Sequence, residues 1–262
     1  MLRSWRLNLL LFLLTCGATY LLGGAAYAAS IMSILLFHEM GHYLQARRYR
    51  VPATLPYFIP MPFSPFGTLG AVIRMNNVGA DRKALFDIGV TGPIAGLVVA
   101  IPVTLWGLAT SQVVEVSAIR EGSLYLGDSL LFSGLSRLVV GAVPEGHDLL
   151  LSPVAFAGWA GLFVTALNLL PIGQLDGGHV VYALLGRRSF AVSALAAVGF
   201  GLTAIFVNPA WTVMVLLVLL MGLRHPPTAD DTVPLGRTRT GVGIASMVFF
   251  LLSFTPDPLR LQ

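Results

Sequence analysis

The chain has 262 residues, of which 56% are hydrophobic and 11% are charged, and its formal net charge is +4. Its mean hydropathy of +0.80 lies far outside the range of soluble domains, so the composition predicts a polytopic membrane protein. Arginine supplies nearly all of the positive charge, with Lys83 the only lysine, and its scatter over loops argues for membrane topology and against nucleic acid as a partner.

The first predicted element is a transmembrane span at residues 7–22. Arg3 and Arg6 precede it and an A-x-A pattern follows at residues 26–28, as in a secretory signal. Cleavage is not expected there, because only about 15 Å of helix would remain before His38, and the second span needs those residues to cross the membrane.

The second predicted helix runs from about residue 25 to Arg47 and contains the pattern H-E-x-x-H. His38 and His42 lie four residues apart, so they project from one face and can share a zinc ion. Glu39 lies beside them, where it can take a proton from zinc-activated water. His38 is about 13 Å along the axis from Arg47, a depth at which ionisable groups are costly and by default functional. The sequence therefore predicts a hydrolytic centre inside the membrane.

The segment at residues 51–75 follows that helix and begins with several prolines, which forbid a continuous helix. Residues 68–75 are typical of a strand, and with residues 57–59 they predict a small sheet beside the metal. The alternative is a hairpin on the membrane surface with only a structural role.

Further apolar stretches predict the remaining spans, and the last two are short for a full crossing. Asn208-Pro209 predicts a tight turn between two antiparallel helices. Residues 111–152 are expected outside, with 130–143 apolar enough to lie on the membrane or dip into it. The predicted spans are residues 88–108, 153–170, 190–207, 209–223 and 242–254.

The predicted fold is an all-α polytopic membrane protein of six to seven transmembrane helices, with a small membrane-associated β segment near residues 53–75. We expect residues 1–262 to form one membrane-embedded domain, with a catalytic core at about 25–186 and C-terminal helices at about 190–255. No polar stretch within these residues is long enough for a separate soluble domain.

The basic residues predict the orientation. If the first span leaves the cytoplasm, thirteen of the sixteen basic residues fall inside, and the exceptions are Arg120, Arg137 and Arg260. The positive-inside rule then places the N-terminus and the opening of the active site in the cytoplasm. We expect an integral protein of the bacterial inner (plasma) membrane.

Two histidines leave a zinc site short of a third protein ligand. Asp176 is the best candidate, because it follows an apolar helix that Pro171 and Gly173 should break at depth. Gly177-Gly178 lets the backbone come close to a neighbour. Other carboxylates fit less well, since Asp87 opens the third span and Asp128 lies in the external segment.

Two motifs in the right order give the chain a resemblance to the site-2 protease family of intramembrane zinc metalloproteases. Residues 37–43 match its H-E-x-x-H signature, and residues 168–178 match its second signature, N-x-x-P-x-x-x-L-D-G. The resemblance covers most of residues 25–186 and is closest to compact bacterial or plastid-type members without a PDZ or CBS domain.

The resemblance implies a role for each matched residue. His38, His42 and Asp176 would bind one Zn²⁺, Glu39 would act as general base and acid, and Asn168 would polarise or hold the scissile carbonyl. The implied activity is hydrolysis of peptide bonds in or near transmembrane segments of membrane proteins, with an extended segment near the metal binding the substrate by strand addition. Its partners would be the lipid bilayer and a membrane-protein substrate, and the sequence does not identify a regulator.

Several residues keep alternative interpretations. A metal transporter or metal-sensing membrane protein would also place histidines and carboxylates in helices, although it needs no general base. His179 is expected to support Asp176 or to pack, with an alternative ligand role left open. His147 is expected to be a surface residue, and His225 to mark a helix end. Gly92 and Gly96 in the third span predict close contact with a neighbouring helix.

Overall fold

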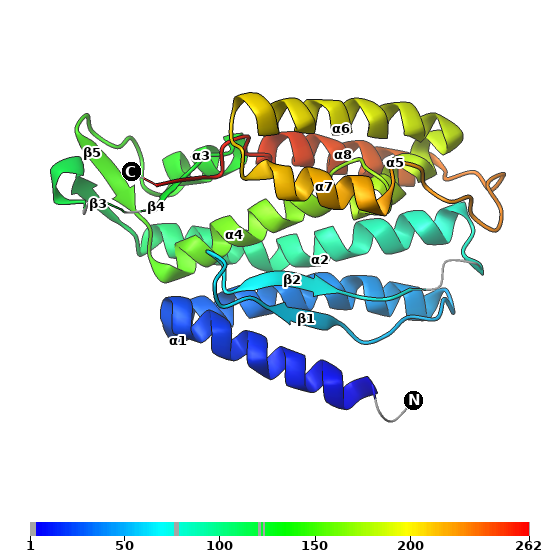
Figure 1. Ribbon diagram of the computed structural model, residues 1–262, viewed down its shortest axis with the longest axis horizontal. Helices are drawn as coiled ribbons and strands as arrows, with labels where there is room; N and C mark the ends of the chain where they lie inside the picture. Colours follow the sequence, from blue (N-terminus) through cyan, green and yellow to red (C-terminus); the bar gives the residue numbers. More distant parts are fainter. Residues whose placement is uncertain (1–3, 76–78, 120–121, 123, 262) are drawn as a thin grey trace.

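The computed structural model describes residues 4–75, 79–119, 122 and 124–261, and it is mostly helical (Figure 1). Arg3 and Arg120, which the topology prediction counts, lie outside the described residues. The elements are α1 (Ser4–Arg48), β1 (Tyr57–Pro60), β2 (Thr68–Val72), α2 (Arg82–Ala109), β3 (Gln112–Glu115), η2 (Val116–Ala118), β4 (Leu124–Leu126), α3 (Leu130–Val139), β5 (His147–Leu150), α4 (Pro153–Asn168), α5 (Asp176–Leu185), η3 (Gly186–Arg188), α6 (Ser189–Phe206), α7 (Trp211–Met221), α8 (Arg237–Ser253) and β6 (Leu259–Leu261).

Long apolar helices confirm that this is a membrane protein of mainly helical fold. In the described residues, three helical stretches are long and apolar enough to cross a membrane: Trp5–Arg48, Arg82–Ala109 and Asp176–Phe206. The helices α3, α4 and α7 are apolar but shorter. The predicted spans fall on the two legs of α1 and on α2, α4, α6, α7 and α8. α7 is short, as expected, with 11 residues, whereas α8 has 17 residues and is longer than α4, which has 16.

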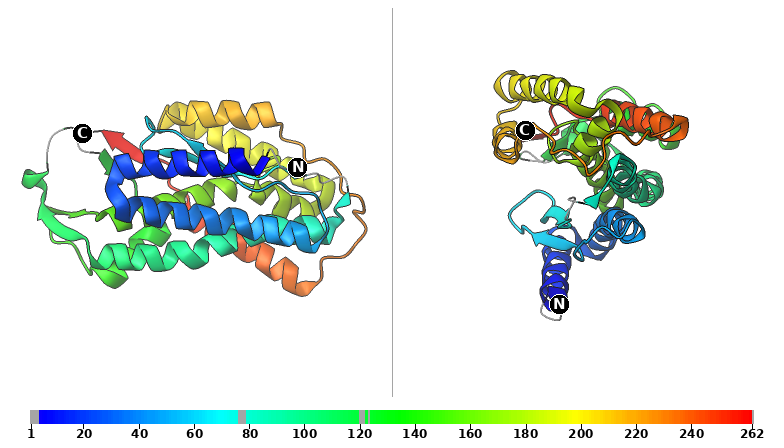
Figure 2. Two further views of the ribbon diagram at one scale, coloured as in Figure 1. Left: turned by 90° about the horizontal axis from the view of Figure 1, so that it is seen from below. Right: turned by 90° about the vertical axis from the view of Figure 1, so that its right-hand side faces the viewer.

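The first two predicted spans are the two legs of α1, which breaks at Gly24. This residue has φ +76 and ψ −174, a conformation that only glycine adopts readily. The chain reverses there, so the two legs run antiparallel (Figure 2). One residue therefore replaces a loop between two membrane helices.

The predicted sheet at residues 53–75 is confirmed as an antiparallel hairpin of β1 and β2. β2 ends at Val72, three residues earlier than predicted, and Met75 forms only an isolated bridge with Ala53. Pro56 stands before β1 and lacks an amide hydrogen, which interrupts the ladder between these points. The hairpin packs along α1, whose Asn8 donates to the carbonyls of residues 55 and 56.

The tip of the hairpin is fixed by aromatic residues. The hydroxyl of fully buried Tyr27 donates to the carbonyl of Phe66 at 2.9 Å. The ring of Phe66 lies against Trp159 and Phe163 of α4, with ring centroids 6.2 and 6.1 Å apart. The hairpin is thus attached both to α1 and to α4, which frame the site described below.

Replacing Tyr27 by phenylalanine is expected to lower the free energy of unfolding by about 1 kcal/mol, because a buried hydrogen bond is lost without a change of shape. Denaturation in mixed detergent micelles would measure this. Tyr20→Phe is the matched control, since Tyr20 is 57% exposed. Equal stability of the two variants would contradict the role given to the Tyr27 hydroxyl.

The segment between α2 and α4 forms small structures at one end of the molecule. β3 pairs with β5, and β4 pairs with β6 near the C-terminus. Within the stretch expected to lie on the membrane, α3 keeps Phe132 buried and leaves Leu130 and Leu138 mostly exposed. α3 thus leaves an apolar face uncovered by the described residues, and its place on the membrane stays a prediction.

α2 lies between the elements that carry the polar motifs. It contacts α1, α4 and α5, which confirms the close packing predicted for the third span. At Gly107 a Cβ would overlap Ala155 of α4, so the small residues let the backbones approach. α6 and α7 are neighbours across the turn at residues 207–210, as the Asn208-Pro209 pair predicted.

Candidate metal centre

The second leg of α1 places two imidazoles on one buried face. His38 and His42 are one helical turn apart, and their ring centroids are 5.0 Å apart with an interplanar angle of 67°. The residues are only 3% and 4% exposed. Burying two ionisable side chains inside an apolar helix is costly unless they have partners, so the surrounding groups decide what this pair can do.

The carboxylate that meets these rings comes from Asp176, the first residue of α5. Residues 169–175 form a helix break after α4, as Pro171 and Gly173 predicted. Gly177 lies so close to the carbonyl of Leu169 that a Cβ would overlap it. A Cβ on Gly178 would likewise overlap the carbonyl oxygen of Gly173. The glycine pair therefore allows the chain to fold tightly back, which brings the first turn of α5 against α1.

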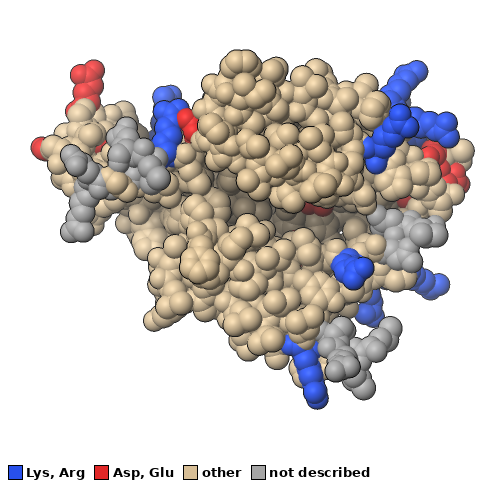
Figure 3. All heavy atoms as spheres, viewed as in Figure 1, with Lys and Arg blue, Asp and Glu red and all other residues tan. Residues whose placement is uncertain are grey.

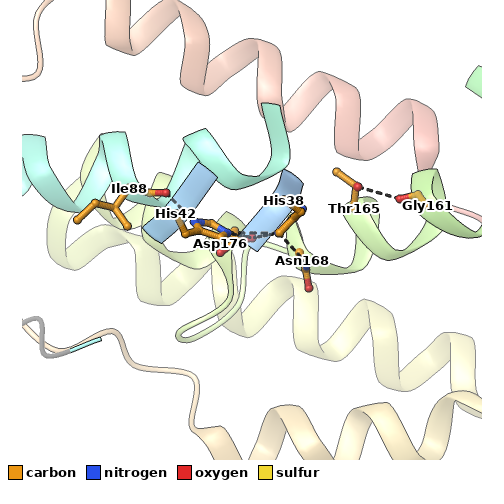
Figure 4. A network of polar contacts seen from close by, with 7 residues as sticks. All are labelled: His38, His42, Ile88, Gly161, Thr165, Asn168 and Asp176. Carbon is orange, nitrogen blue, oxygen red and sulfur yellow. Dashed lines mark hydrogen bonds and ion pairs between the residues drawn. The ribbon is translucent and has the colours of Figure 1, made fainter. Parts of the chain in front are cut away.

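The three ligand atoms form a nearly equilateral triangle (Figure 4). Nε2 of His38, Nε2 of His42 and Oδ2 of Asp176 are each 3.2 Å from the other two. Two ligands of a tetrahedral zinc, each 2.0–2.1 Å from the ion, stand about 3.3 Å apart. The donor set and its spacing thus fit zinc with one position left open.

The backbone of α2 fixes the orientation of His42. Its Nδ1 donates to the carbonyl oxygen of Ile88 at 2.7 Å, so Nε2 carries the lone pair that faces Asp176. Gly92 stands behind the same ring, where a Cβ would overlap the imidazole, and at Gly96 a Cβ would lie 3.1 Å from Nδ1 of His38. The small-residue pattern of α2 makes room for the two histidines.

Asn168, the last residue of α4, lies at the edge of the triangle. Its side-chain amide is 3.1 Å from Nε2 of His38 (Figure 4). Thr165, one turn earlier, donates to the carbonyl of Gly161 and stays within its own helix. Asn168 is therefore the amide that a group bound beside the three ligand atoms would meet first.

Glu39 is 5% exposed and follows His38 directly. Among the described residues, none donates a hydrogen bond to its carboxylate. A buried carboxylate without such donors keeps its capacity to accept a proton. Because Glu39 is buried and adjacent to His38 in the chain, it is the candidate general base.

The site has an opening to the surface. The side chain of Asp176 is 16% exposed, whereas those of His38 and His42 are 4% and 5% exposed. Figure 3 shows the molecule hollowed between α6 and α7 on one side and α1 with the β1–β2 hairpin on the other, and an acidic side chain is visible at the floor. Water can therefore approach from the side that Asp176 faces.

The other histidines named in the sequence analysis do not join the cluster of His38, His42 and Asp176. His147 is exposed and lies at β5, at the far end of the molecule. His179 is buried, and its Nδ1 is 2.6 Å from Nε2 of His225. The expectation that His225 marks a helix end is wrong, because α7 ends four residues earlier, at Met221.

One ion pair near the metal centre escaped the sequence analysis. Asp87 forms an ion pair with Arg239 of α8, with both N–O distances 2.8 Å, and it accepts a hydrogen bond from Tyr49. The sequence analysis expected Asp87 to open the third span, but α2 begins five residues earlier, at Arg82, and the partner of Asp87 is 152 positions away. No local pattern could have predicted that pair.

Comparison with known proteins gives one family. A sequence model of Peptidase family M50 matches residues 26–207. A protein of Oryza sativa subsp. indica, named probable zinc metalloprotease EGY2, chloroplastic, is 30% identical over 237 residues, which cover 90% of this chain and 42% of that protein. The Arabidopsis thaliana protein named probable zinc metalloprotease EGY1, chloroplastic, is 31% identical over 236 residues, which cover 87% of this chain and 42% of that protein. The chain thus spans about two fifths of the length of these relatives.

Proposed function

This chain belongs to peptidase family M50, the site-2 protease family, and we propose that it is an intramembrane zinc metalloprotease that hydrolyses peptide bonds within or near transmembrane segments. The observation that carries the proposal is the triangle of His38, His42 and Asp176, with buried Glu39 next to His38 in the sequence. The relatives described above are named as zinc metalloproteases, which supports the same activity.

The proposed mechanism follows from the placement of the side chains. Zinc, when bound by the three ligands, supplies Lewis-acid activation of water and of the scissile carbonyl. Glu39 takes a proton from the attacking water while the oxygen of that water bonds to the carbonyl carbon. Glu39 later gives a proton to the amine that leaves when the C–N bond breaks. Asn168 donates from its amide to the carbonyl oxygen as negative charge develops there.

The substrate we propose is a membrane-protein helix that has been locally unwound. β2 pairs with β1 on one side, and its other edge has no partner strand among the described residues. Leu69 and Val72 of this strand are 60% and 50% exposed. An extended substrate segment could add to this edge through backbone hydrogen bonds, with its side chains meeting these apolar residues.

We further propose that the protein lies in a bacterial inner membrane, with its N-terminus and active-site opening in the cytoplasm. The uneven division of the sixteen basic residues supports this orientation. Most of the basic side chains visible in Figure 3 lie in its right-hand half, where Figure 1 places the start of α2 and the end of α5. The relatives carry the word chloroplastic in their names, and a plastid membrane is the competing location.

The test uses the purified protein in liposomes with two assays run side by side. We expect a model transmembrane substrate to be cleaved, cleavage to stop when a chelator removes the metal, and cleavage to return with added zinc. Zinc uptake into the same liposomes is expected to equal that of protein-free liposomes. Zinc transport without cleavage of any membrane segment would overturn the proposal in favour of a transporter.

A further inference from the structure

The chain after α7 returns to the metal centre, although the family match ends at residue 207. We call residues 222–239, which run from the end of α7 into the first turn of α8, the clasp. The clasp crosses the end of the molecule at which α2 begins and α5 ends (Figure 1). Its first residue touches the loop before Asp176, where a Cβ on Gly173 would overlap the carbonyl oxygen of Gly222. Leu235, near its other end, is 7% exposed and belongs to one apolar cluster with residues of α2 and α5.

His225 joins the clasp to one face of α5. Its Nε2 is 2.6 Å from Nδ1 of His179, and its ring stacks on Tyr182 with centroids 4.3 Å apart. Nδ1 of His225 donates to the carbonyl of Pro226, so in the neutral ring Nε2 accepts from Nδ1 of His179. Burial lowers the pKa of His225, which favours this neutral form.

Asp231 joins the clasp to the same helix one turn further on. Burial opposes its ionisation, but hydrogen bonds from Thr228 and Tyr182 outweigh it, so the pKa of Asp231 is lowered. Arg82 completes the junction, because its guanidinium donates to the carbonyls of Ala183 and Leu184 at the end of α5. The helix that begins with Asp176 is thus held by the clasp at His179 and Tyr182.

Arg239 joins the clasp to the other half of the metal centre. Its guanidinium makes two 2.8 Å bonds to the carboxylate of Asp87, which also accepts from Tyr49 at the end of α1. Asp87 directly precedes Ile88, whose carbonyl accepts from Nδ1 of His42. Arg239 is therefore connected to His42 through two neighbouring residues of α2, because Asp87 binds Arg239 and Ile88 binds His42.

We propose that the clasp is a positioning element for the metal centre. His225 fixes the position of α5 and hence of Asp176, while Arg239 fixes the position of the turn of α2 that orients His42. The two contacts act on ligands that come from different helices, and both come from one short segment outside the family match. The zinc-binding part of the proposed function is the basis for this inference. His179 and His225 do not form a second zinc site, since 2.6 Å is a hydrogen-bond distance and two zinc ligands stand about 3.3 Å apart.

The test measures metal binding by the full chain in detergent. His225→Phe keeps a ring on Tyr182 but leaves His179 without its acceptor, and Arg239→Ala leaves Asp87 without its ion pair. Each is expected to weaken zinc binding about tenfold in chelator competition and to shift the visible absorption bands of the cobalt-substituted protein. The matched controls are His147→Phe and Arg237→Ala, which change exposed residues of the same types.

The cobalt spectrum separates positioning from simple stabilisation. Lower thermal stability with unchanged zinc affinity and an unchanged cobalt spectrum would overturn the proposal, as would equal losses in the control variants. If His225→Phe does not fold, Asp231→Asn is the milder variant, and the same two readouts apply with a smaller expected change. A wild type that binds zinc but cleaves no substrate would defeat the proposed function and leave this test intact, because neither readout is proteolysis.

Discussion

Replacing Glu39 by glutamine is expected to leave zinc bound and to lower kcat for a transmembrane substrate by between about 10² and 10⁴-fold. The amide has nearly the shape of the carboxylate, but it cannot take a proton from water. The three ligand atoms belong to His38, His42 and Asp176, so the metal loses no donor. Zinc content per chain and initial cleavage rates in liposomes are the measurements.

The control for this variant is Glu145→Gln, which makes the same change at an exposed position in the turn before β5. It should cleave at the wild-type rate. Cleavage by Glu39→Gln at a comparable rate would show that Glu39 is not the general base. Loss of zinc from that variant would show instead that Glu39 is needed to build the site. Fragments that appear in membranes of cells with the wild type but not with Glu39→Gln would also reveal the natural substrates.

Replacing Gly92 by alanine is expected to weaken zinc binding by about 100-fold and to reduce cleavage accordingly. The new Cβ would overlap the imidazole of His42, so either this ring must leave its position or α2 must move away from α1. Overpacking at such a contact costs about 1–3 kcal/mol, and about 2.7 kcal/mol corresponds to 100-fold in affinity. Chelator competition measures the affinity directly.

Three glycine-to-alanine variants with different expected effects test this prediction. At Gly96 a Cβ would lie 3.1 Å from Nδ1 of His38, so a shift of a few tenths of an ångström suffices and Gly96→Ala should have a smaller effect. Gly199 in α6 has no atom within 4 Å of the Cβ position among the described residues, and Gly199→Ala should bind zinc as the wild type does. Any other order of the three variants would contradict the view that α2 sets the space for the histidines.

The clustering of the candidate ligands could be predicted because most of their signals are local. His38 and His42 lie about one helical turn apart, so their spacing alone determines that they share a face, with Glu39 next to His38 in the sequence. The prediction of Asp176 needed one more step. The second and fourth predicted spans run in the same direction, so the motifs at their ends reach a similar depth in the membrane. The break at Pro171 and the glycines after Asp176 are again local signals, and the structure places all of these residues where the spacing suggests.

The clasp could not be predicted because its contacts depend on the path of an irregular segment. Residues between Met221 and Arg237 carry no apolar period, so nothing in the sequence says where His225 comes to lie. The pair of Asp87 and Arg239 is equally non-local, and each residue alone looks like a charge at a helix end. The end of β2 was missed for a related reason, since strand propensity does not show that Pro56 interrupts the partner.

The distance along the chain between the residues of the metal centre also determines when this centre can form during biosynthesis. His42 and Asp176 are separated by 134 positions (176 minus 42), and a ribosome adding about 5–20 residues per second needs about 7 to 27 s for that stretch. Arg239 follows 63 positions after Asp176 (239 minus 176), which adds about 3 to 13 s. The first helices therefore enter the bilayer as an apolar scaffold with two histidines and no complete zinc site. The candidate zinc site of His38, His42 and Asp176 therefore cannot form before Asp176 has been synthesised, and the ion pair of Arg239 with Asp87 can form only later.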